Sequence, residues 1–173
     1  HFDGELRELD KLSMANIQEY AKIVGAEYRL IEGKPFNSML TAPCQKVYMI
    51  HPEFDKYDDV LMLDIDMFAP RGMTTNVFEE PGVGLYNPIQ QNLHRRLVQQ
   101  YGILGNMSAP YWGGAIYKMG KKLRTALRNA SVLDDAWMIH FNRPYHFEDE
   151  GIFHVLANRA GINPRGTYMD PKW

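Results

Sequence analysis

The sequence has few of the features that assign a chain to a specialised class. Among its 173 residues there is one cysteine, Cys44, so an internal disulfide framework and a zinc–thiolate cluster are excluded. No apolar run approaches the roughly 18 residues of a membrane span, and nothing at its start reads as a signal peptide. We therefore expect no membrane segment and a cytoplasmic location. The formal net charge is only −2, without a dense block of Lys and Arg, so nucleic acid is not an expected partner.

What is present is an ordinary globular composition. Hydrophobic residues make up 45% of the chain and charged residues 23%, and the length suits one domain with a core of its own. We therefore expect a single domain over residues 1–173.

Apolar periodicity and breaker residues predict helices that alternate with strands. The predicted helices span residues 6–24, 44–50, 90–102, 121–130 and 148–161. The predicted strands span residues 27–31, 60–63, 82–87 and 113–120. The strand at 60–63 is apolar without alternation, as is typical of a parallel sheet that helices cover on both faces. The pattern predicts an α/β fold, in which a single mixed, mostly parallel sheet is flanked by helices.

Two carboxylates, Asp64 and Asp66, follow the apolar strand and are separated by Ile65. An extended chain would point both of them to the same side, and open α/β sheets bind ligands at the carboxyl ends of their strands. Like charges this close are costly to desolvate unless a cation lies between them. Carboxylate oxygens suit Mg²⁺ or Mn²⁺, which keep positions for water and phosphates. A pair of solvated loop aspartates is the plainer explanation.

Three stretches, in order, resemble a known family. "KYDDVLMLDIDMFAP" (56–70) resembles the D-x-D segment of GT-A-fold glycosyltransferases, which use nucleotide-diphosphate sugars as donors. "YWGGAIYKMG" (111–120) is similar to the strand that faces donor sugar and acceptor in that fold. "FEDEGIFHVL" (147–156) is similar to the Glu-Asp motif of inverting members such as the β-1,4-galactosyltransferases. The similarity spans roughly residues 12 to 161.

The resemblance implies a metal-dependent transfer of a sugar to an acceptor hydroxyl, expected on a glycan, with inversion and with a UDP-sugar as the expected donor. Mn²⁺ or Mg²⁺ on Asp64 and Asp66 would neutralise the leaving diphosphate, and Asp149 would take the acceptor's proton. The expected donor-binding residues are Lys46, Asp64, Ile65, Asp66 and Gly114. The expected acceptor-binding residues are Trp112, Gly113, Glu148 and Asp149.

Several of these residues also have plainer explanations. The run 148–150 could serve only to cap a helix, and Lys46 could be a solvated lysine. Trp112 and the glycines after it could simply open a strand. In addition, the family normally begins with a strand whose following loop holds the nucleobase, and many members supply a metal-binding histidine near the end of the domain. Because neither feature is present, we expect the chain to lack the extreme N- and C-terminal parts of such a domain.

Three other functions fit part of the pattern. An aspartate-based phosphohydrolase would have Thr or Val two places after the second aspartate, where Phe68 stands. A metal-dependent nucleotidyltransferase shares the cation but typically begins with a glycine-rich, basic loop. A non-catalytic module that binds sugar nucleotides would not need Asp149 beside a metal-bound diphosphate.

Overall fold

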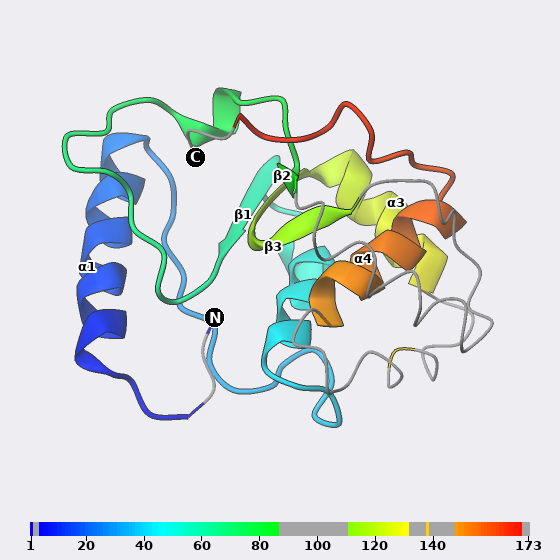
Figure 1. Cartoon of the computed structure of the whole chain (residues 1–173), viewed down its shortest axis with the longest axis horizontal. Coiled ribbons are helices and arrows are strands. Elements are labelled where there is room, and N and C mark those ends of the chain that lie inside the picture. The colour runs from blue at the N-terminus through cyan, green and yellow to red at the C-terminus, as the bar shows by residue number, and fades with distance from the viewer. Residues whose placement is uncertain (2–3, 87–110, 132–137, 139–147, 171–173) are drawn as a thin grey trace.

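The computed structural model describes residues 1, 4–86, 111–131, 138 and 148–170. Figure 1 shows its helices and strands in their spatial arrangement. The α-helices are α1 (Glu8–Ile23), α3 (Lys121–Ser131) and α4 (Glu148–Arg159). The 3-10 helices are η1 (Pro43–Ile50), η2 (Pro52–Phe54) and η3 (Val77–Glu79). The strands are β1 (Asp59–Leu63), β2 (Gly84–Tyr86) and β3 (Trp112–Gly120).

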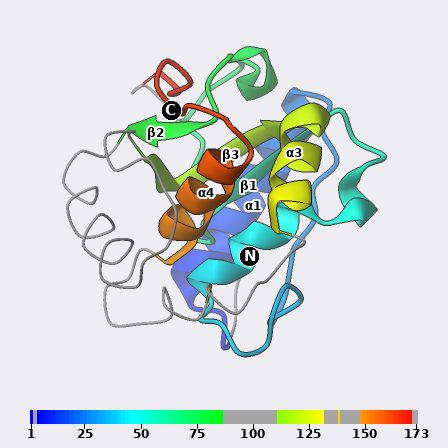
Figure 2. The same ribbon diagram turned by 90° about the vertical axis from the view of Figure 1, so that its right-hand side faces the viewer.

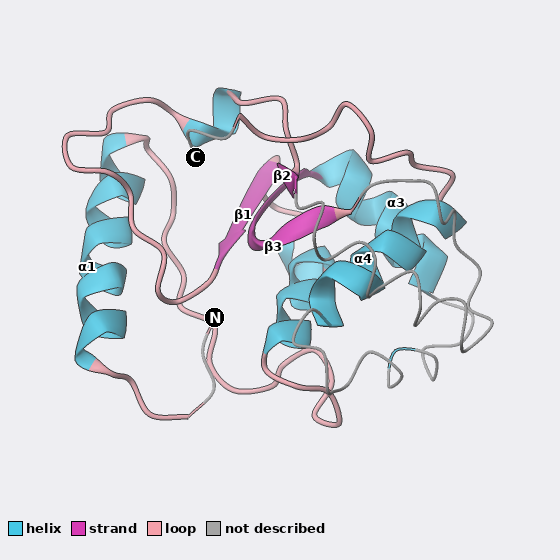
Figure 3. Cartoon of the chain, in the orientation of Figure 1, coloured by secondary structure: helices cyan, strands magenta, loops and turns pink. Residues whose placement is uncertain are grey.

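The sheet corrects the predicted fold class. Within the described residues it has three strands in the order β1-β3-β2, and both pairings are antiparallel (Figure 3). The predicted mixed, mostly parallel sheet flanked by helices is therefore wrong, and so is the GT-A architecture that the resemblance implied. The segment 27–31, predicted as a strand, forms none. The predicted helix at 90–102 lies outside the described residues.

The apolar run of β1 has a different cause from the one predicted. Met62 belongs to a core formed with α3, α4 and η1, whereas Leu61 and Leu63 pack against a second core on the α1 side. Figure 2 shows α3 and α4 in front of the sheet and α1 behind it. Both faces are therefore covered, and this requires apolar residues on both sides whichever way the strands run.

The predicted helices within the described chain are present, although 43–50 is a 3-10 helix and α1 docks in an unexpected way. Polar side chains attach α1 to the segment 67–77. Ser13 donates to the Met67 carbonyl, Asn16 bonds both backbone groups of Ala69, and the Tyr20 hydroxyl donates to the Thr75 carbonyl at 2.7 Å. None of the helices in the described part of the chain has the length and hydropathy to cross a bilayer.

Arg124 joins α3 to the loop that precedes β1. Its side chain is fully buried, and its two terminal nitrogens donate to backbone carbonyls on several segments. The four accepting carbonyls belong to Phe54, Tyr57, Asp58 and Met119, at 3.1, 2.7, 3.3 and 2.5 Å. One guanidinium therefore ties η2 and the turn after it to the end of β3.

The outer edge of β1 faces an open cavity of about 550 Å³, which residues 24–29 border on the other side. On the inner edge, the Asp64 N–H donates to Ala115 and the Lys121 N–H to Asp58. Because antiparallel bonding alternates, Val60 and Met62 also bond β3, while the amides of Leu61 and Leu63 point outward.

We expect hydrogen exchange to divide β1 by this alternation. The amides of Val60 and Met62 should exchange more slowly than those of Leu61 and Leu63 by several orders of magnitude. Only the first two amides are hydrogen-bonded to β3, and these bonds must break before exchange can occur. Amide exchange followed by NMR gives each rate separately. Equal protection of all four amides would show that a further segment pairs with this edge.

Candidate functional site

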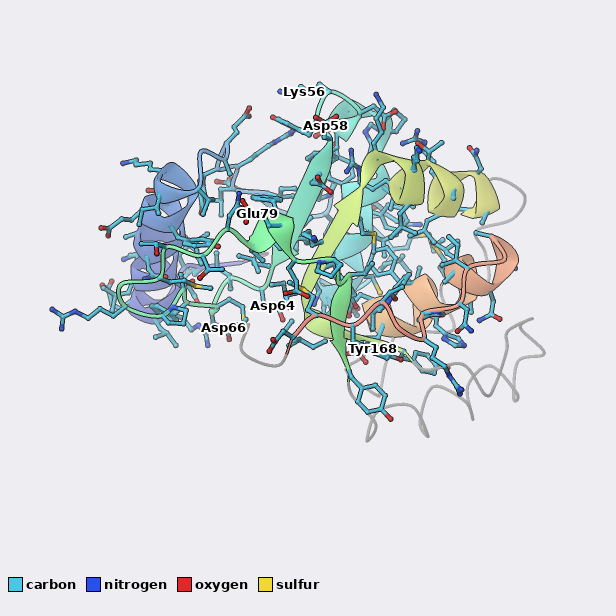
Figure 4. All side chains as sticks on the ribbon, turned by 90° about the horizontal axis from the view of Figure 1, so that it is seen from above. Lys56, Asp58, Asp64, Asp66, Glu79 and Tyr168 are labelled. Carbon is cyan, nitrogen blue, oxygen red and sulfur yellow. The ribbon has the colours of Figure 1, made fainter. Side chains whose placement is uncertain are left out.

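Asp64 and Asp66 lie at the end of β1, away from Lys56 and Asp58 at its start (Figure 4). The chain turns here, because the Met67 N–H donates to the Asp64 carbonyl at 3.2 Å. The carboxylates are therefore not aligned by an extended strand, as the spacing had suggested. They nevertheless line one open pocket of about 350 Å³ together with Ile65. Their side chains are 41% and 53% exposed, so both can reach a ligand.

Charged side chains of both signs also line this pocket, together with His1, Ala42 and Pro43. Glu5, Arg7 and Asp10 come from the start of α1 and the residues before it, and Lys46 comes from η1. Arg7 pairs with Asp10 at 2.6 Å, and its guanidinium also lies 4.0 Å from Asp66. Arg7 escaped the sequence analysis because no local motif connects it to the D-x-D segment.

Lys46 is buried beneath the pocket, so it is not a solvated lysine. Its Nζ donates to Asp64 Oδ1 at 2.8 Å and to the Gly114 carbonyl at 2.6 Å, and it lies 3.0 Å from Asp149 Oδ2. Burial opposes the charge, but the attraction of Asp149 and of Asp64 outweighs it and raises the pKa of Lys46 above its usual range. The ammonium is therefore charged and has an acceptor for each of its three N–H groups.

A break in the ladder between β2 and β3 brings Gly114 to this cluster. Gly84 pairs with Tyr117 but Leu85 pairs with Gly113, so residues 114–116 of β3 have no opposite residue on β2. Gly114 uses its backbone groups elsewhere: its N–H donates to Glu150 Oε1 at 2.6 Å and its carbonyl accepts from Lys46. Bulges of this kind re-aim side chains and are common next to active sites.

Asp149 and Glu150 bring two carboxylates from the first turn of α4 into the interior. They are 2% and 3% exposed, and the Tyr117 hydroxyl donates to Asp149 Oδ2 at 2.9 Å. Burial raises the pKa of Asp149 despite the nearby Lys46. Burial, and then the charge of Asp149, raises the pKa of Glu150 to about 8. These carboxylates thus bond β3 and η1, which helix capping alone would not require.

Of the four residues predicted to bind the acceptor, Asp149 belongs to the cluster, whereas Trp112 and Gly113 lie elsewhere. Trp112 is 2% exposed, packs in the core, and donates its indole N–H to the Thr167 hydroxyl at 2.9 Å. Gly113 lies where a Cβ would approach the Leu85 carbonyl to 3.0 Å, so it serves the close approach of β2. Glu148 begins α4, and its side chain lies outside the described part. Contact of these residues with an acceptor stays a prediction.

The structure thus places Lys46 in direct contact with Asp64, Gly114 and Asp149. Ile65 and Asp66 line the same pocket as Lys46 and Asp64. It does not bring Trp112 or Gly113 into the pocket wall. Tyr117 and Glu150 belong to the cluster but had no signal of their own, because their contacts depend on the bulge.

The donor set of this pocket fits a divalent cation that shares its coordination with a substrate. Among the residues that the structure describes, no group of three or more His, Cys, Asp or Glu side chains could hold a metal by itself. Asp64 and Asp66 supply exposed carboxylate oxygens, and Mg²⁺ is commonly held by one or two carboxylates with waters and phosphates completing its shell. The chemistry of the pair is therefore compatible with a cation that shares its coordination with a diphosphate, but not with a closed metal site.

Comparisons of the chain with protein-family models, with curated proteins and with solved structures found no match. The function is therefore argued from the residues of the site.

Proposed function

We propose that the chain is a metal-dependent glycosyltransferase, which binds a nucleotide-diphosphate sugar in the pocket of Asp64 and Asp66 and transfers the sugar to an acceptor hydroxyl. The observation that carries the proposal is the pair of exposed carboxylates beside a buried, charged lysine. This arrangement provides oxygen ligands for a cation and a fixed positive charge within one pocket.

The charges of the pocket support a role for a metal. The carboxylates of Glu5, Asp10, Asp64 and Asp66 outnumber the cationic side chains of Arg7 and Lys46, so the pocket would repel a free diphosphate. When bound, Mg²⁺ or Mn²⁺ supplies Lewis-acid stabilisation of the charge that develops on the leaving diphosphate. The chain itself would hold the cation with Asp64 and Asp66, and Lys46 would supply positive charge from the pocket wall.

The stereochemical course depends on Asp149. As the proton acceptor of an inverting transfer, it would need to meet the acceptor hydroxyl, but it is 2% exposed and its Oδ2 already meets Lys46 and Tyr117. Inversion, the role of Asp149 as base, and a glycan as acceptor therefore stay predictions. The burial of Asp149 supports a different use, which is to hold Lys46 in place.

Replacing Asp66 with alanine should weaken Mn²⁺-dependent binding of UDP and UDP-sugars at least about tenfold, because one of two metal-binding carboxylates is lost. The unfolding free energy should change little, since the side chain is 53% exposed. Calorimetric titrations with Mn²⁺ and with EDTA measure the effect.

The matched control is Asp58→Ala, which removes an exposed carboxylate at the opposite end of β1 (Figure 4). It should leave nucleotide binding unchanged. Equal nucleotide affinity in Mn²⁺ and in EDTA would contradict the proposal. Binding without turnover of any donor and acceptor would instead favour a sugar-nucleotide-binding module.

A further inference from the structure

We infer that Lys46 is an internal cation that occupies Asp64 when no divalent ion is bound, and that metal binding frees it to bond the donor's diphosphate. The inference rests on the proposed function and adds to it a coupling between metal and donor. Lys46 would thereby make the site bind its two ligands together rather than separately.

The three partners of Lys46 differ in how freely they can move. Asp149 is 3% exposed in its side chain, and the Gly114 carbonyl belongs to a strand, so both are fixed by their surroundings. Asp64 follows the last residue of β1, and its side chain is 41% exposed. When a ligand disturbs the cluster, Asp64 is therefore the partner that can turn away, while Lys46 stays where it is.

The ammonium and a divalent cation compete for the same carboxylate. Lys46 Nζ lies 2.8 Å from Asp64 Oδ1, and a metal bound to that carboxylate would sit within a few ångströms of this charge. Like charges at such distances repel, so Lys46 opposes binding of the metal alone. Turning Asp64 toward the metal separates the two cations and removes one acceptor from Lys46.

The freed N–H group of Lys46 then faces an anion. Lys46 lines the same pocket as Asp64 and Asp66, so a diphosphate on the metal could accept the hydrogen bond that Asp64 gave up. Hydrogen bonds between an ammonium and a phosphate are charge-assisted and strong. The diphosphate thus compensates for the repulsion that the metal meets, and each ligand raises the affinity for the other by the same factor.

Asp149 acts in this scheme as a positioning residue. Its buried Oδ2 lies 3.0 Å from Lys46 Nζ, and the Gly114 carbonyl accepts from the same nitrogen at 2.6 Å, so Lys46 keeps two interior partners when Asp64 leaves. Without Asp149, Lys46 would depend more strongly on Asp64 and would yield it less easily to a metal.

The experiment compares Lys46→Met with wild type by calorimetric titration of the full chain, using Mn²⁺ alone and then inorganic pyrophosphate at saturating Mn²⁺. Pyrophosphate serves as the probe because it needs no assumption about the nucleobase. In Lys46→Met, Mn²⁺ alone should bind about fivefold tighter, as expected from removing one unit charge at this range in a solvated site. Pyrophosphate should bind about tenfold weaker, because its charge-assisted bond is lost.

Two further variants make the outcome unambiguous. Lys46→Met/Asp149→Asn removes the buried carboxylate that the single variant leaves without a cation, and it should show the same gain in Mn²⁺ affinity. Asp149→Asn alone keeps Lys46 on Asp64 and should show no such gain.

The possible failures are distinguishable. If wild type binds Mn²⁺ and pyrophosphate but neither Lys46 variant gains affinity for Mn²⁺, the inference is wrong and the proposed function stands. If wild type shows no Mn²⁺-dependent binding, both are wrong.

Discussion

Replacing Arg124 with methionine should lower the free energy of unfolding by about 3–5 kcal/mol. The variant removes the guanidinium hydrogen bonds to four backbone carbonyls, those of Phe54, Tyr57, Asp58 and Met119. A hydrogen bond from a charged donor contributes about 1.5–3 kcal/mol, and the carbonyls of Phe54 and Asp58 lose less because each keeps a backbone N–H donor. Urea unfolding followed by circular dichroism measures the loss.

Lys122→Met is the matched control for this variant, since it makes a similar change on an exposed position of the same helix α3. Its effect should stay within about 0.5 kcal/mol. A loss below about 1 kcal/mol in Arg124→Met would show that the turn before β1 satisfies its carbonyls in another way.

Replacing Gly114 with alanine should lower the free energy of unfolding by about 1–3 kcal/mol, the usual range for overpacking, and should abolish Mn²⁺-dependent diphosphate binding. The added Cβ would lie 2.9 Å from Asp149 Oδ2 and 3.0 Å from Glu150 Oε1. Relief of these contacts must displace a carboxylate or the strand, and either movement breaks at least one of the contacts that join Gly114, Asp149 and Glu150 to the cluster. Unfolding and calorimetry on the same preparation give both quantities.

Gly120→Ala provides the comparison within β3. Its Cβ would meet only the end of the exposed Asp59 side chain, at 3.3 Å. We expect little effect on stability or on diphosphate binding. A Gly114→Ala protein that keeps wild-type diphosphate affinity would show that the contact between Lys46 and Gly114 does not support the site.

The sequence predicted local elements better than it predicted how they pair. Helix α1 and the strand at 60–63 follow from spacing and breakers, which are properties of neighbouring residues. The direction in which β1 meets β3 depends on residues far apart in the chain, and no local pattern encodes it. The unbroken apolar run suggested a parallel sheet. Met62 and its neighbours Leu61 and Leu63 show that an antiparallel strand also has such a run when both of its faces are covered.

In the candidate site, too, local features could be predicted from the sequence and long-range contacts could not. The sequence assigned Asp64, Asp66 and Lys46 to one site, and the structure places all three around the same pocket, while their binding of a metal and a donor stays a prediction. The partners of Lys46 could not be predicted, because the contact with Gly114 arises at a bulge and the contact with Asp149 joins distant elements. The same bulge turns Gly114 and Tyr117 toward the α4 side, although simple alternation would place them on opposite faces.

The open outer edge of β1 also affects how one molecule meets another. An edge with unpaired N–H and C=O groups can recruit a strand from a second chain, which is a common route to aggregation. Here the strand has five residues, and Glu27, Lys56 and Asp59 stand along the cavity beside it. A short strand and charged neighbours are two means by which β-proteins discourage such pairing. Because no strand of the described residues covers this edge, its charge and short length are the features that oppose self-association there.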